Sequence, residues 1–224
     1  MWGSGVVVDK EKRVVLTCAH VLAEDEPVSV FWGGHSVKAS VLWRSADGVP
    51  YDVAVLQLAD DACVAELEAL ALDTRPPRVG EPVLAVGYPL FSERCAVPAE
   101  ALSEHRVVRP LVSRGEVSGW WRSSSSQILS TCCVQSGASG GPLLRLGPTG
   151  PTAIGVLVCN AQLGCGRDAV VYPHVNFALW ADTVAGPINE FLASGDAAVL
   201  AGLQCDSPSV QRQWKLQPPK MCKL

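Results

Sequence analysis

Short apolar segments rich in Val and Leu recur along most of this chain, and turn-forming residues separate them. Such segments between Gly, Pro, Asn and Asp are typical of β-strands. The 20 Gly and 16 Pro supply the turns, and Gly33-Gly34 is placed for a two-residue hairpin. We therefore expect an all-β protein. The expected strands are residues 5–8, 13–18, 28–32, 36–43, 53–58, 82–87, 111–118, 127–134, 142–145, 153–159 and 170–176.

The remaining segments are predicted to connect or follow these strands. Residues 60–78 are polar and acidic, which suits a connection between two lobes. Residues 182–193 favour a helix that Gly186-Pro187 interrupts, because proline removes a backbone donor. A second helix is expected over 195–203, and the Pro- and Gln-containing tail from about 205 is expected to be loose.

Composition excludes several functional classes. A net charge of −4 does not favour electrostatic binding to nucleic acid or to an anionic membrane surface. No apolar run approaches the roughly 20 residues that span a bilayer, and the N-terminus lacks a secretory signal pattern. The nine cysteines are odd in number, which favours free thiols. Cys159 and Cys165 lack a partnering pair at zinc-finger spacing, so we expect no metal and no cofactor.

The sequence Gly137-Ala138-Ser139-Gly140-Gly141-Pro142 is the strongest chemical signal. A hydroxyl nucleophile needs a tight turn that exposes it, with backbone N–H groups aimed at the developing oxyanion. Glycines beside a serine permit such a turn. We therefore predict Ser139 as a nucleophile, with the N–H groups of Gly137 and Ser139 as its oxyanion hole. An ordinary glycine-rich turn is the alternative.

His20 and Asp52 complete a predicted triad with Ser139. His20 follows an apolar strand, where an imidazole can take and return the serine proton. Asp52 stands immediately before a strand, so its carboxylate can orient that imidazole. Taken alone, each of His20 and Asp52 is better explained by a structural role. The order His, Asp, Ser, however, is that of the chymotrypsin type. The separations place His20 and Asp52 in a first lobe and Ser139 in a second.

Together these motifs resemble those of trypsin-fold serine proteases, and within them the HtrA/Deg branch. The resemblance covers about residues 3–185. It implies two six-stranded antiparallel Greek-key β-barrels with a C-terminal helix, and a first barrel that lacks its N-terminal strand. We assign 1–75 to the first barrel, 76–195 to the second and 196–224 to a tail. The segments that carry the resemblance, besides the serine motif, are Gly3-Ser4-Gly5-Val6-Val7, Asp52-Val53-Ala54-Val55-Leu56, Val79-Gly80-Glu81-Pro82-Val83 and Val175-Asn176-Phe177-Ala178.

The resemblance also implies how substrate is selected. Ala138 stands where secreted trypsins carry an Asp that pairs with a freed N-terminus, so we expect no such activation. The residue six before the nucleophile lies at the base of the substrate pocket in this fold, and here it is Cys133. A neutral, small residue is therefore expected on the acyl side of the cleaved bond. Gly155 and Asn176 are predicted to join Cys133 in this pocket.

The chain ends in Cys222-Lys223-Leu224, which resembles the Ser-Lys-Leu peroxisomal address. This ending predicts the peroxisomal matrix and a peroxisomal import receptor as a partner. A trypsin-like domain with such an ending resembles the peroxisomal processing proteases. That resemblance implies polypeptide substrates among the peroxisomal matrix enzymes, removal of their leader peptides, and self-cleavage.

Two other functions stay open. One is a catalytically silent, protease-like module that binds proteins, although the intact triad argues against it. The other is an HtrA-like quality-control protease, which the short stretch after residue 185 disfavours. A homo-oligomer, or association with an N-terminal portion of a longer chain, also stays open.

Overall fold

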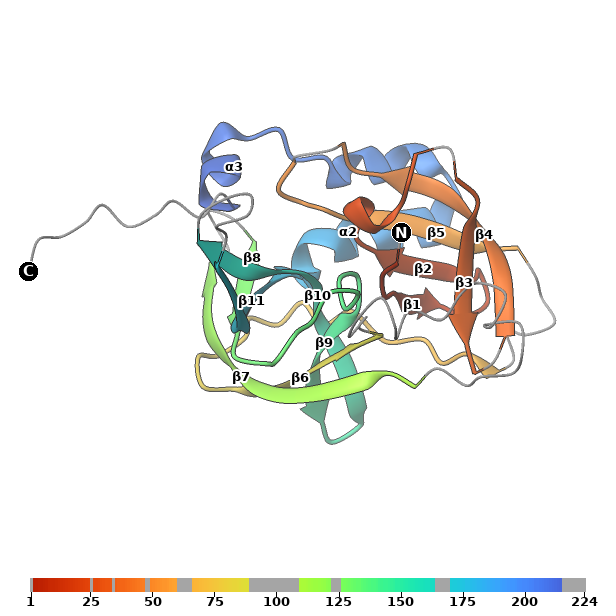
Figure 1. Ribbon diagram of the computed structural model, residues 1–224. Helices are drawn as coiled ribbons and strands as arrows, with labels where there is room; N and C mark the ends of the chain where they lie inside the picture. The colour runs from red at the N-terminus through yellow and green to blue at the C-terminus, as the bar shows by residue number, and fades with distance from the viewer. Residues whose placement is uncertain are drawn as a thin grey trace, which may run out of the picture.

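The computed structural model describes residues 2–24, 26–33, 35–46, 49–59, 66–88, 109–121, 126–163 and 170–214, without the side chains of Leu163 and Pro173. Two β-lobes lie side by side, the first in red and orange and the second mainly in green and teal (Figure 1). The mostly β architecture predicted above is confirmed. Residues 91–106 and the terminal Cys222-Lys223-Leu224 lie outside the described residues.

The first lobe is an open sheet of five antiparallel strands in the order β1-β2-β5-β4-β3. The hairpin predicted at residues 33–34 is confirmed, because Trp32 pairs with His35 and Gly33 has φ 54°. Among the described residues this sheet has five strands, one fewer than a six-stranded barrel. Its elements are β1 (Val6–Asp9), β2 (Val14–Thr17), the 3-10 turn η1 (Ala19–Val21), β3 (Val28–Trp32), β4 (His35–Arg44) and β5 (Ala54–Leu58).

The second lobe is a closed barrel of six strands in the order β10-β11-β8-β7-β6-β9. Its interior is filled by large side chains that are almost fully buried, among them Ile128, Leu143, Ile154 and Trp180. Closure pairs every strand on both edges, so this lobe has no unpaired strand edge. The strands are β6 (Pro82–Gly87), β7 (Leu111–Trp121), β8 (Gln127–Ser130), β9 (Pro142–Gly147), β10 (Gly150–Leu163) and β11 (Val170–Trp180).

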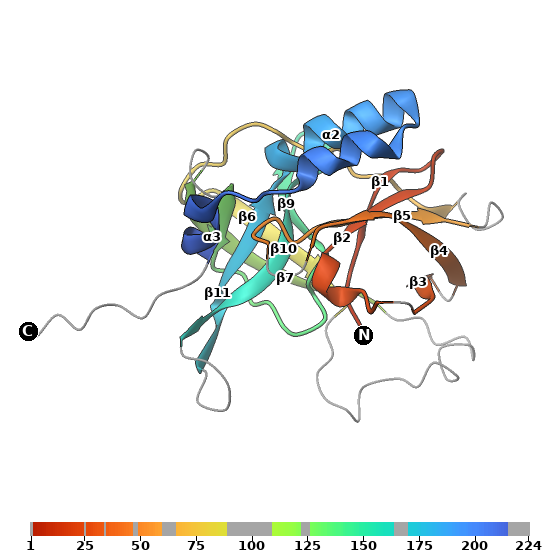
Figure 2. The same ribbon diagram turned by 90° about the horizontal axis from the view of Figure 1, so that it is seen from above.

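Helix α2 (Ala181–Ser194) follows the last strand and packs across both lobes (Figure 2). The predicted interruption at Gly186-Pro187 is wrong, because the helix continues through both residues. Burial of Val184, Ile188 and Phe191 in a cluster shared by the two lobes outweighs the hydrogen bond that Pro187 removes. The 3-10 segment η4 (Ala197–Leu203) then buries Leu200 and Leu203 in the same cluster.

The tail is not loose throughout, because residues 208–214 form helix α3 (Pro208–Trp214). Pro208 occupies the first helical position, where its missing N–H costs nothing. Trp214 packs against Phe177 with ring centroids 6.4 Å apart, which anchors the helix beside the barrel. Among the described residues, no helix has the length and apolar character required to cross a membrane.

The connection between the lobes is fixed to the closed barrel by a buried acid. The Asp73 backbone N–H donates to the Ala153 carbonyl at 2.8 Å, and Leu72 forms a bridge with Ala153. Arg145 donates to the Asp73 carboxylate at 2.7 Å and also pairs with Glu81. Hydrogen bonds from Arg75, with a further contribution from Arg145, hold the pKa of Asp73 well below its usual range. The predicted linker is therefore held by specific charged contacts.

Candidate active site

The predicted base and acid lie together in the first lobe. His20 is carried by η1, directly after β2, and its Nδ1 contacts Asp52 Oδ2. The backbone N–H of His20 also donates to Asp52 Oδ1 at 2.9 Å. This hydrogen bond with Asp52 raises the pKa of the imidazole above its ordinary value of 6.5, against a smaller lowering by desolvation. Asp52 therefore fixes the orientation of His20 and stabilises its protonated form.

Asp52 is held in place by the start of β5. The Ser45 N–H donates to the Val53 carbonyl at 3.0 Å, and the Val53 N–H donates to Ser45 Oγ at 3.2 Å. The Asp52 side chain is 18% exposed, against 49% for His20. The carboxylate thus lies at the base of the site and the imidazole at its open side. This arrangement suits an orienting acid and a base that must reach substrate.

Ser139 lies in the loop between β8 and β9 of the closed barrel. Gly137 and Gly140 have φ angles of 93° and 88°, which L side chains rarely adopt. The Gly140 N–H donates to the Leu157 carbonyl at 2.8 Å. A side chain at Gly140 would collide with the Ser4 carbonyl and the Thr17 hydroxyl. The loop therefore needs glycine at these positions to fit between β10 and the first lobe.

The Ser139 hydroxyl donates to the Val158 carbonyl at 3.0 Å. Among the hydrogen bonds between described residues, none joins Ser139 to His20. Val158 also lines the cleft that His20 and Asp52 line. Serine and imidazole therefore border the same residue of β10, with the hydroxyl turned toward backbone rather than toward the base.

The N–H groups predicted to form an oxyanion hole are available. Within the described part of the chain, no hydrogen bond uses the N–H of Gly137 or Ser139. The Ala138 N–H between them is occupied by the Gln135 carbonyl at 3.0 Å. Two free donors on either side of an occupied one are the kind of arrangement that can bind an oxyanion.

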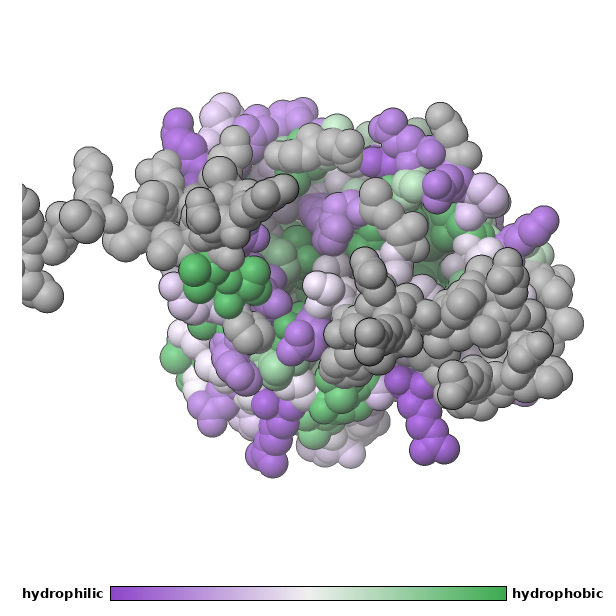
Figure 3. Space-filling model, viewed as in Figure 1, coloured by the Kyte–Doolittle hydropathy of each residue, from purple (hydrophilic) through white to green (hydrophobic). Residues whose placement is uncertain are grey.

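A cleft opens beside the His20–Asp52 pair. Val49 and Pro50 form one wall, and Gln211 and Trp214 of α3 form another. Figure 3 shows this face of the molecule hollowed near its middle, with hydrophobic side chains (green) visible inside the hollow. An open cleft beside the imidazole can receive part of a substrate.

The predicted substrate-pocket residues are not all placed alike. Cys133 lines a small cavity that Ala138 and Leu157 also line. Gly155 is buried in the middle of β10, where a Cβ would meet the Leu179 carbonyl. Asn176 has no exposed surface and binds Ser130 Oγ and the Cys132 carbonyl, each at 2.6 Å. The structure therefore places Gly155 and Asn176 in the barrel wall, and only Cys133 faces a cavity.

One group of side chains carries the donor types of a metal site. Cys18 Sγ, a His20 ring nitrogen and an Asp52 oxygen lie within 4.8 Å of one another. The Cys18 thiol is fully buried and donates to the Leu157 carbonyl at 3.1 Å. Burial, with a further contribution from Asp52, raises the pKa of this thiol well above its ordinary value. A protonated thiol is a poor ligand, so this group is better read as support beneath the dyad.

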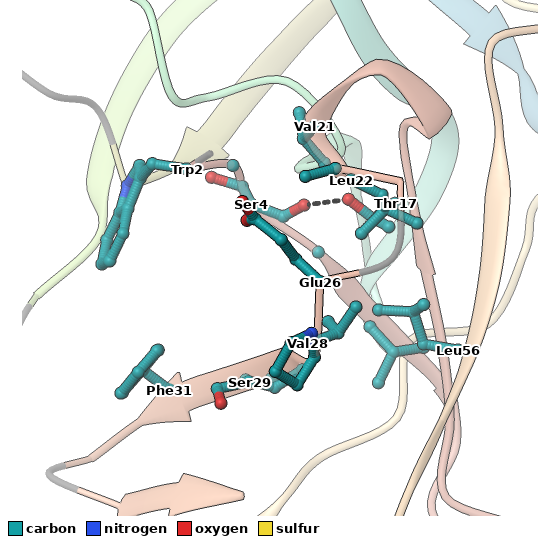
Figure 4. A pocket seen from close by; sticks show the side chains of 16 residues that line it. Trp2, Ser4, Thr17, Val21, Leu22, Glu26, Val28, Ser29, Phe31 and Leu56 are labelled. Carbon is teal, nitrogen blue, oxygen red and sulfur yellow. Dashed lines mark hydrogen bonds between the residues drawn. The ribbon is translucent and has the colours of Figure 1, made fainter. Parts of the chain in front are cut away.

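Sequence reasoning missed four residues that shape the site. Val158 supplies the carbonyl that binds Ser139, and Trp214 forms a cleft wall from the tail that was expected to be loose. Ser4 holds the nucleophile loop from the first lobe through the Gly137 carbonyl, and Thr17 in turn holds Ser4, as the dashed line in Figure 4 shows. The Gly3-Ser4-Gly5 motif was a usable signal for Ser4. A backbone carbonyl such as that of Val158 leaves no signal in sequence.

Comparison with known proteins defines the class. Residues 3–147 match the trypsin-like peptidase domain family, and the chain belongs to that family. In structure it is similar to a serine endoprotease from Yersinia pestis, with a TM-score of 0.60 and 22% identity over 86% of this chain and 58% of that one. A Mycobacterium tuberculosis protease in its active form gives 0.59 and 24% identity, over 82% and 70% of the two chains.

Curated relatives narrow the relationship further. The chain is 30% identical to the peroxisomal leader peptide-processing protease of Mus musculus, over 98% of this chain and 36% of the relative. The human protein of that name is 27% identical over the same share. The Lactococcus lactis serine protease Do-like HtrA is 30% identical over 64% of this chain and 34% of that protein. The chain thus spans about a third of the length of the curated relatives it matches.

Proposed function

We propose that this chain is a serine endopeptidase that uses Ser139, His20 and Asp52. The observation that carries the proposal is the paired imidazole and carboxylate beside Val158, the residue whose carbonyl holds the Ser139 hydroxyl. Unpaired N–H groups at Gly137 and Ser139 support it, because acyl transfer needs donors for the developing negative charge.

In the proposed reaction the Ser139 hydroxyl leaves the Val158 carbonyl and turns toward His20. Rotation about one side-chain bond between staggered positions is sufficient to redirect a hydroxyl. His20 Nε2 then takes the hydroxyl proton as Ser139 attacks the peptide carbonyl. The same nitrogen returns the proton to the leaving amine, which gives an acyl-enzyme that water hydrolyses. Asp52 holds Nδ1 throughout, and the N–H groups of Gly137 and Ser139 bind the oxyanion.

The preferred substrate has a small neutral residue on the acyl side of the cleaved bond. The cavity beside Cys133 is small and is lined without any carboxylate. A basic side chain would therefore lose its hydration there without gaining a partner. Cleavage of a peptide library strictly after Arg or Lys would refute this preference.

Peroxisomal matrix precursors are the proposed physiological substrates, through leader-peptide removal and self-cleavage. The two mammalian relatives bear the name of such a protease, and Cys222-Lys223-Leu224 resembles a peroxisomal address. An import receptor that reads this tripeptide is the proposed partner. Import of a fluorescent fusion, compared with the same fusion lacking the last three residues, tests the localisation.

Labelling with a fluorophosphonate tests the catalytic proposal, because this reagent needs an activated serine. The expected result is a single adduct on Ser139 that is lost in Ser139→Ala. Ser136→Ala is the matched control, because Ser136 is exposed in the same loop, and it should label normally. Absence of labelling in the folded wild-type chain would contradict the proposal.

A second function has one observation in its favour. The Ser139 hydroxyl is bound to the Val158 carbonyl rather than to the imidazole, as suits a protease-like module that binds peptides without cleaving them. The two functions differ in the labelling experiment. A binding module retains peptide affinity in Ser139→Ala and gives no adduct in the wild-type chain.

A further inference from the structure

We propose that helix α3, and Trp214 above all, selects a bulky apolar side chain in the substrate. The side chain concerned belongs to the preceding residue, which is the residue just before the acyl-side residue in the substrate chain. The inference rests on the peptidase function proposed above and defines one more feature of its substrate. Helix α3 lies outside residues 3–147, which match the trypsin-like peptidase domain. The family match therefore does not account for this wall of the cleft.

Helix α3 turns one face toward the cleft. Gln211 and Trp214 are half-buried and line the cleft, whereas Arg212 and Gln213 are exposed. Because residues three apart lie on the same face of a helix, Gln211 and Trp214 present a single face to the cleft. No residue of α3 is fully buried, so this face is accessible to a substrate side chain.

Contacts with both lobes hold α3 at the cleft. Trp214 packs on Phe177 with ring centroids 6.4 Å apart, and Figure 2 shows α3 beside β11. The segment before α3 is joined to the first lobe, because the Ala46 N–H donates to Gln204 Oε1 at 3.4 Å. Ala46 itself lines the cleft. The helix therefore serves as a wall that is attached on both sides of the cleft.

The lining of the cleft favours an apolar side chain. Its apolar lining residues come from both lobes and from α3, and they include Val49, Pro50, Val158, Cys159 and Trp214. An apolar side chain that leaves water for such a cleft gains free energy in proportion to its buried area. The Asp52 carboxylate also borders the cleft but already pairs with His20. A basic side chain would therefore lose hydration without gaining an unpaired acid.

The position of the cleft relative to Ser139 determines which substrate residue it receives. The cavity beside Cys133, proposed above for the acyl-side residue, and the cleft border neighbouring residues of β10. Leu157 lines the cavity and Val158 lines the cleft. Successive side chains of an extended polypeptide point to opposite sides. When the acyl-side residue enters the cavity, the side chain of the preceding residue is therefore directed toward the cleft.

The test uses the whole chain and the diphenyl phosphonates acetyl-Leu-Ala and acetyl-Gly-Ala, in which a phosphonate replaces the carboxyl group of Ala. Ser139 Oγ bonds to phosphorus, and phenol leaves with the serine proton. We expect the rate constant for labelling to be at least about tenfold larger with Leu than with Gly. Hydrogen exchange provides a readout that does not depend on rate. The Leu adduct should slow exchange in α3 more than the Gly adduct does.

Variants of α3 separate the wall from the rest of the site. Trp214→Ala should lower the rate with acetyl-Leu-Ala more than the rate with acetyl-Gly-Ala, so that their ratio approaches one. Trp214→Phe keeps an aromatic ring that can pack on Phe177 and should keep most of the ratio. Gln213→Ala is the matched control, because Gln213 is exposed on the same helix, and it should keep the wild-type ratio.

The possible failures are distinguishable. A wild-type ratio near one, or a ratio that Trp214→Ala leaves unchanged, overturns the selection by α3. An equal fall of both rates in Trp214→Ala gives Trp214 a packing role only and also overturns it, as does faster labelling by the corresponding acetyl-Lys-Ala phosphonate. These results leave the peptidase function intact, because Ser139 is still labelled. If neither the phosphonates nor a fluorophosphonate labels Ser139, the peptidase function is refuted, and the selection by α3 is refuted with it.

Discussion

The two lobes are both built of antiparallel strands, but only the second lobe is a closed barrel. The second lobe is a closed six-stranded barrel with fully buried Ile128, Leu143 and Trp180, and it carries the Ser139 loop. The first lobe carries His20 and Asp52 on an open five-stranded sheet, whose edge strands are only partly buried. The nucleophile loop is therefore carried by a barrel whose strands are all paired. The base and the acid are carried by an open sheet that packs against α2 and the second lobe.

The shared core shows where that dependence lies. Val14 and Val53 of the first lobe pack in one cluster with Val158 of the second lobe and Ile188 of α2. His20 and Asp52 each lie within a few residues of this cluster in sequence. The difference between the lobes predicts that chemistry is most sensitive to changes in the first lobe, and stability most sensitive to changes in the second.

The largest expected effect follows from Asp52→Asn. Replacing the carboxylate by an amide removes the charge that orients His20 while it keeps the side-chain shape. We expect the rate of peptide cleavage to fall by about 10³–10⁴-fold, with little change in the free energy of unfolding. A fall of less than tenfold would show that Asp52 does not orient the base.

A pair of core substitutions compares the lobes directly. Leu143→Ala removes a fully buried side chain from the closed barrel and should lower the free energy of unfolding by about 2–5 kcal/mol. Val30→Ala removes a partly buried one from the edge strand β3 and should cost about 1 kcal/mol. Chemical denaturation measures both. Equal losses would contradict the contrast drawn between closed and open lobes.

Asn176→Ala tests whether this residue belongs to the wall or to the substrate pocket. The change strands the Ser130 hydroxyl and the Cys132 carbonyl inside the barrel. We expect a loss of about 1–3 kcal/mol in the free energy of unfolding, with the preferred acyl-side residue unchanged. If the variant cleaves a peptide library after a different acyl-side residue and keeps its stability, Asn176 belongs to the substrate pocket.

The connection between the lobes should weaken in acid. Because the pKa of Asp73 is lowered by its arginine partners, its contribution is full above the ordinary value of 3.8 and is lost as pH falls below it. Wild type should therefore exceed Asp73→Asn in stability by about 1–2 kcal/mol at neutral pH. The difference should shrink below about pH 4. A difference independent of pH would exclude the ion pair as its source.

The smallest expected effect is a displaced pH profile. Neutral His20 is the active base, and Asp52 raises the pKa of His20 above 6.5. The labelling rate of Ser139 should therefore rise with pH through a midpoint above 6.5. In Asp52→Asn the residual rate should show a lower midpoint, because the charge that stabilised the imidazolium is gone. A midpoint that rises in the variant would reverse the assigned roles.

The sequence predicted those features that depend on local pattern. Short apolar segments located each strand of the described residues, and the glycines around Ser139 marked a turn that needs φ angles of 93° and 88°. The open first lobe was expected from a resemblance. Predictions from local pattern were wrong for segments whose structure is determined by packing against residues distant in sequence. Pro187 stays helical because α2 is buried against both lobes, and Trp214 is ordered because it packs on Phe177.

The contacts of the predicted site residues also depend on packing between strands that are distant in sequence. His20 and Asp52 meet as predicted, because their strands β2 and β5 pair directly. Asn176 was assigned to the pocket by position in the fold, but its amide satisfies buried partners inside the barrel. The bond from Ser139 to the Val158 carbonyl depends on a side-chain torsion, which no sequence pattern specifies.

A crystal structure of the chain after reaction with a fluorophosphonate tests the assembly of the site most directly. We predict phosphorus bonded to Ser139 Oγ, with a phosphoryl oxygen between the N–H groups of Gly137 and Ser139. His20 Nε2 should lie within about 3 Å of an oxygen on the adduct. An adduct on any other residue would contradict the assignment of Ser139 as the nucleophile. An adduct on Ser139 without a hydrogen bond to His20 would contradict a single catalytic centre formed by both lobes.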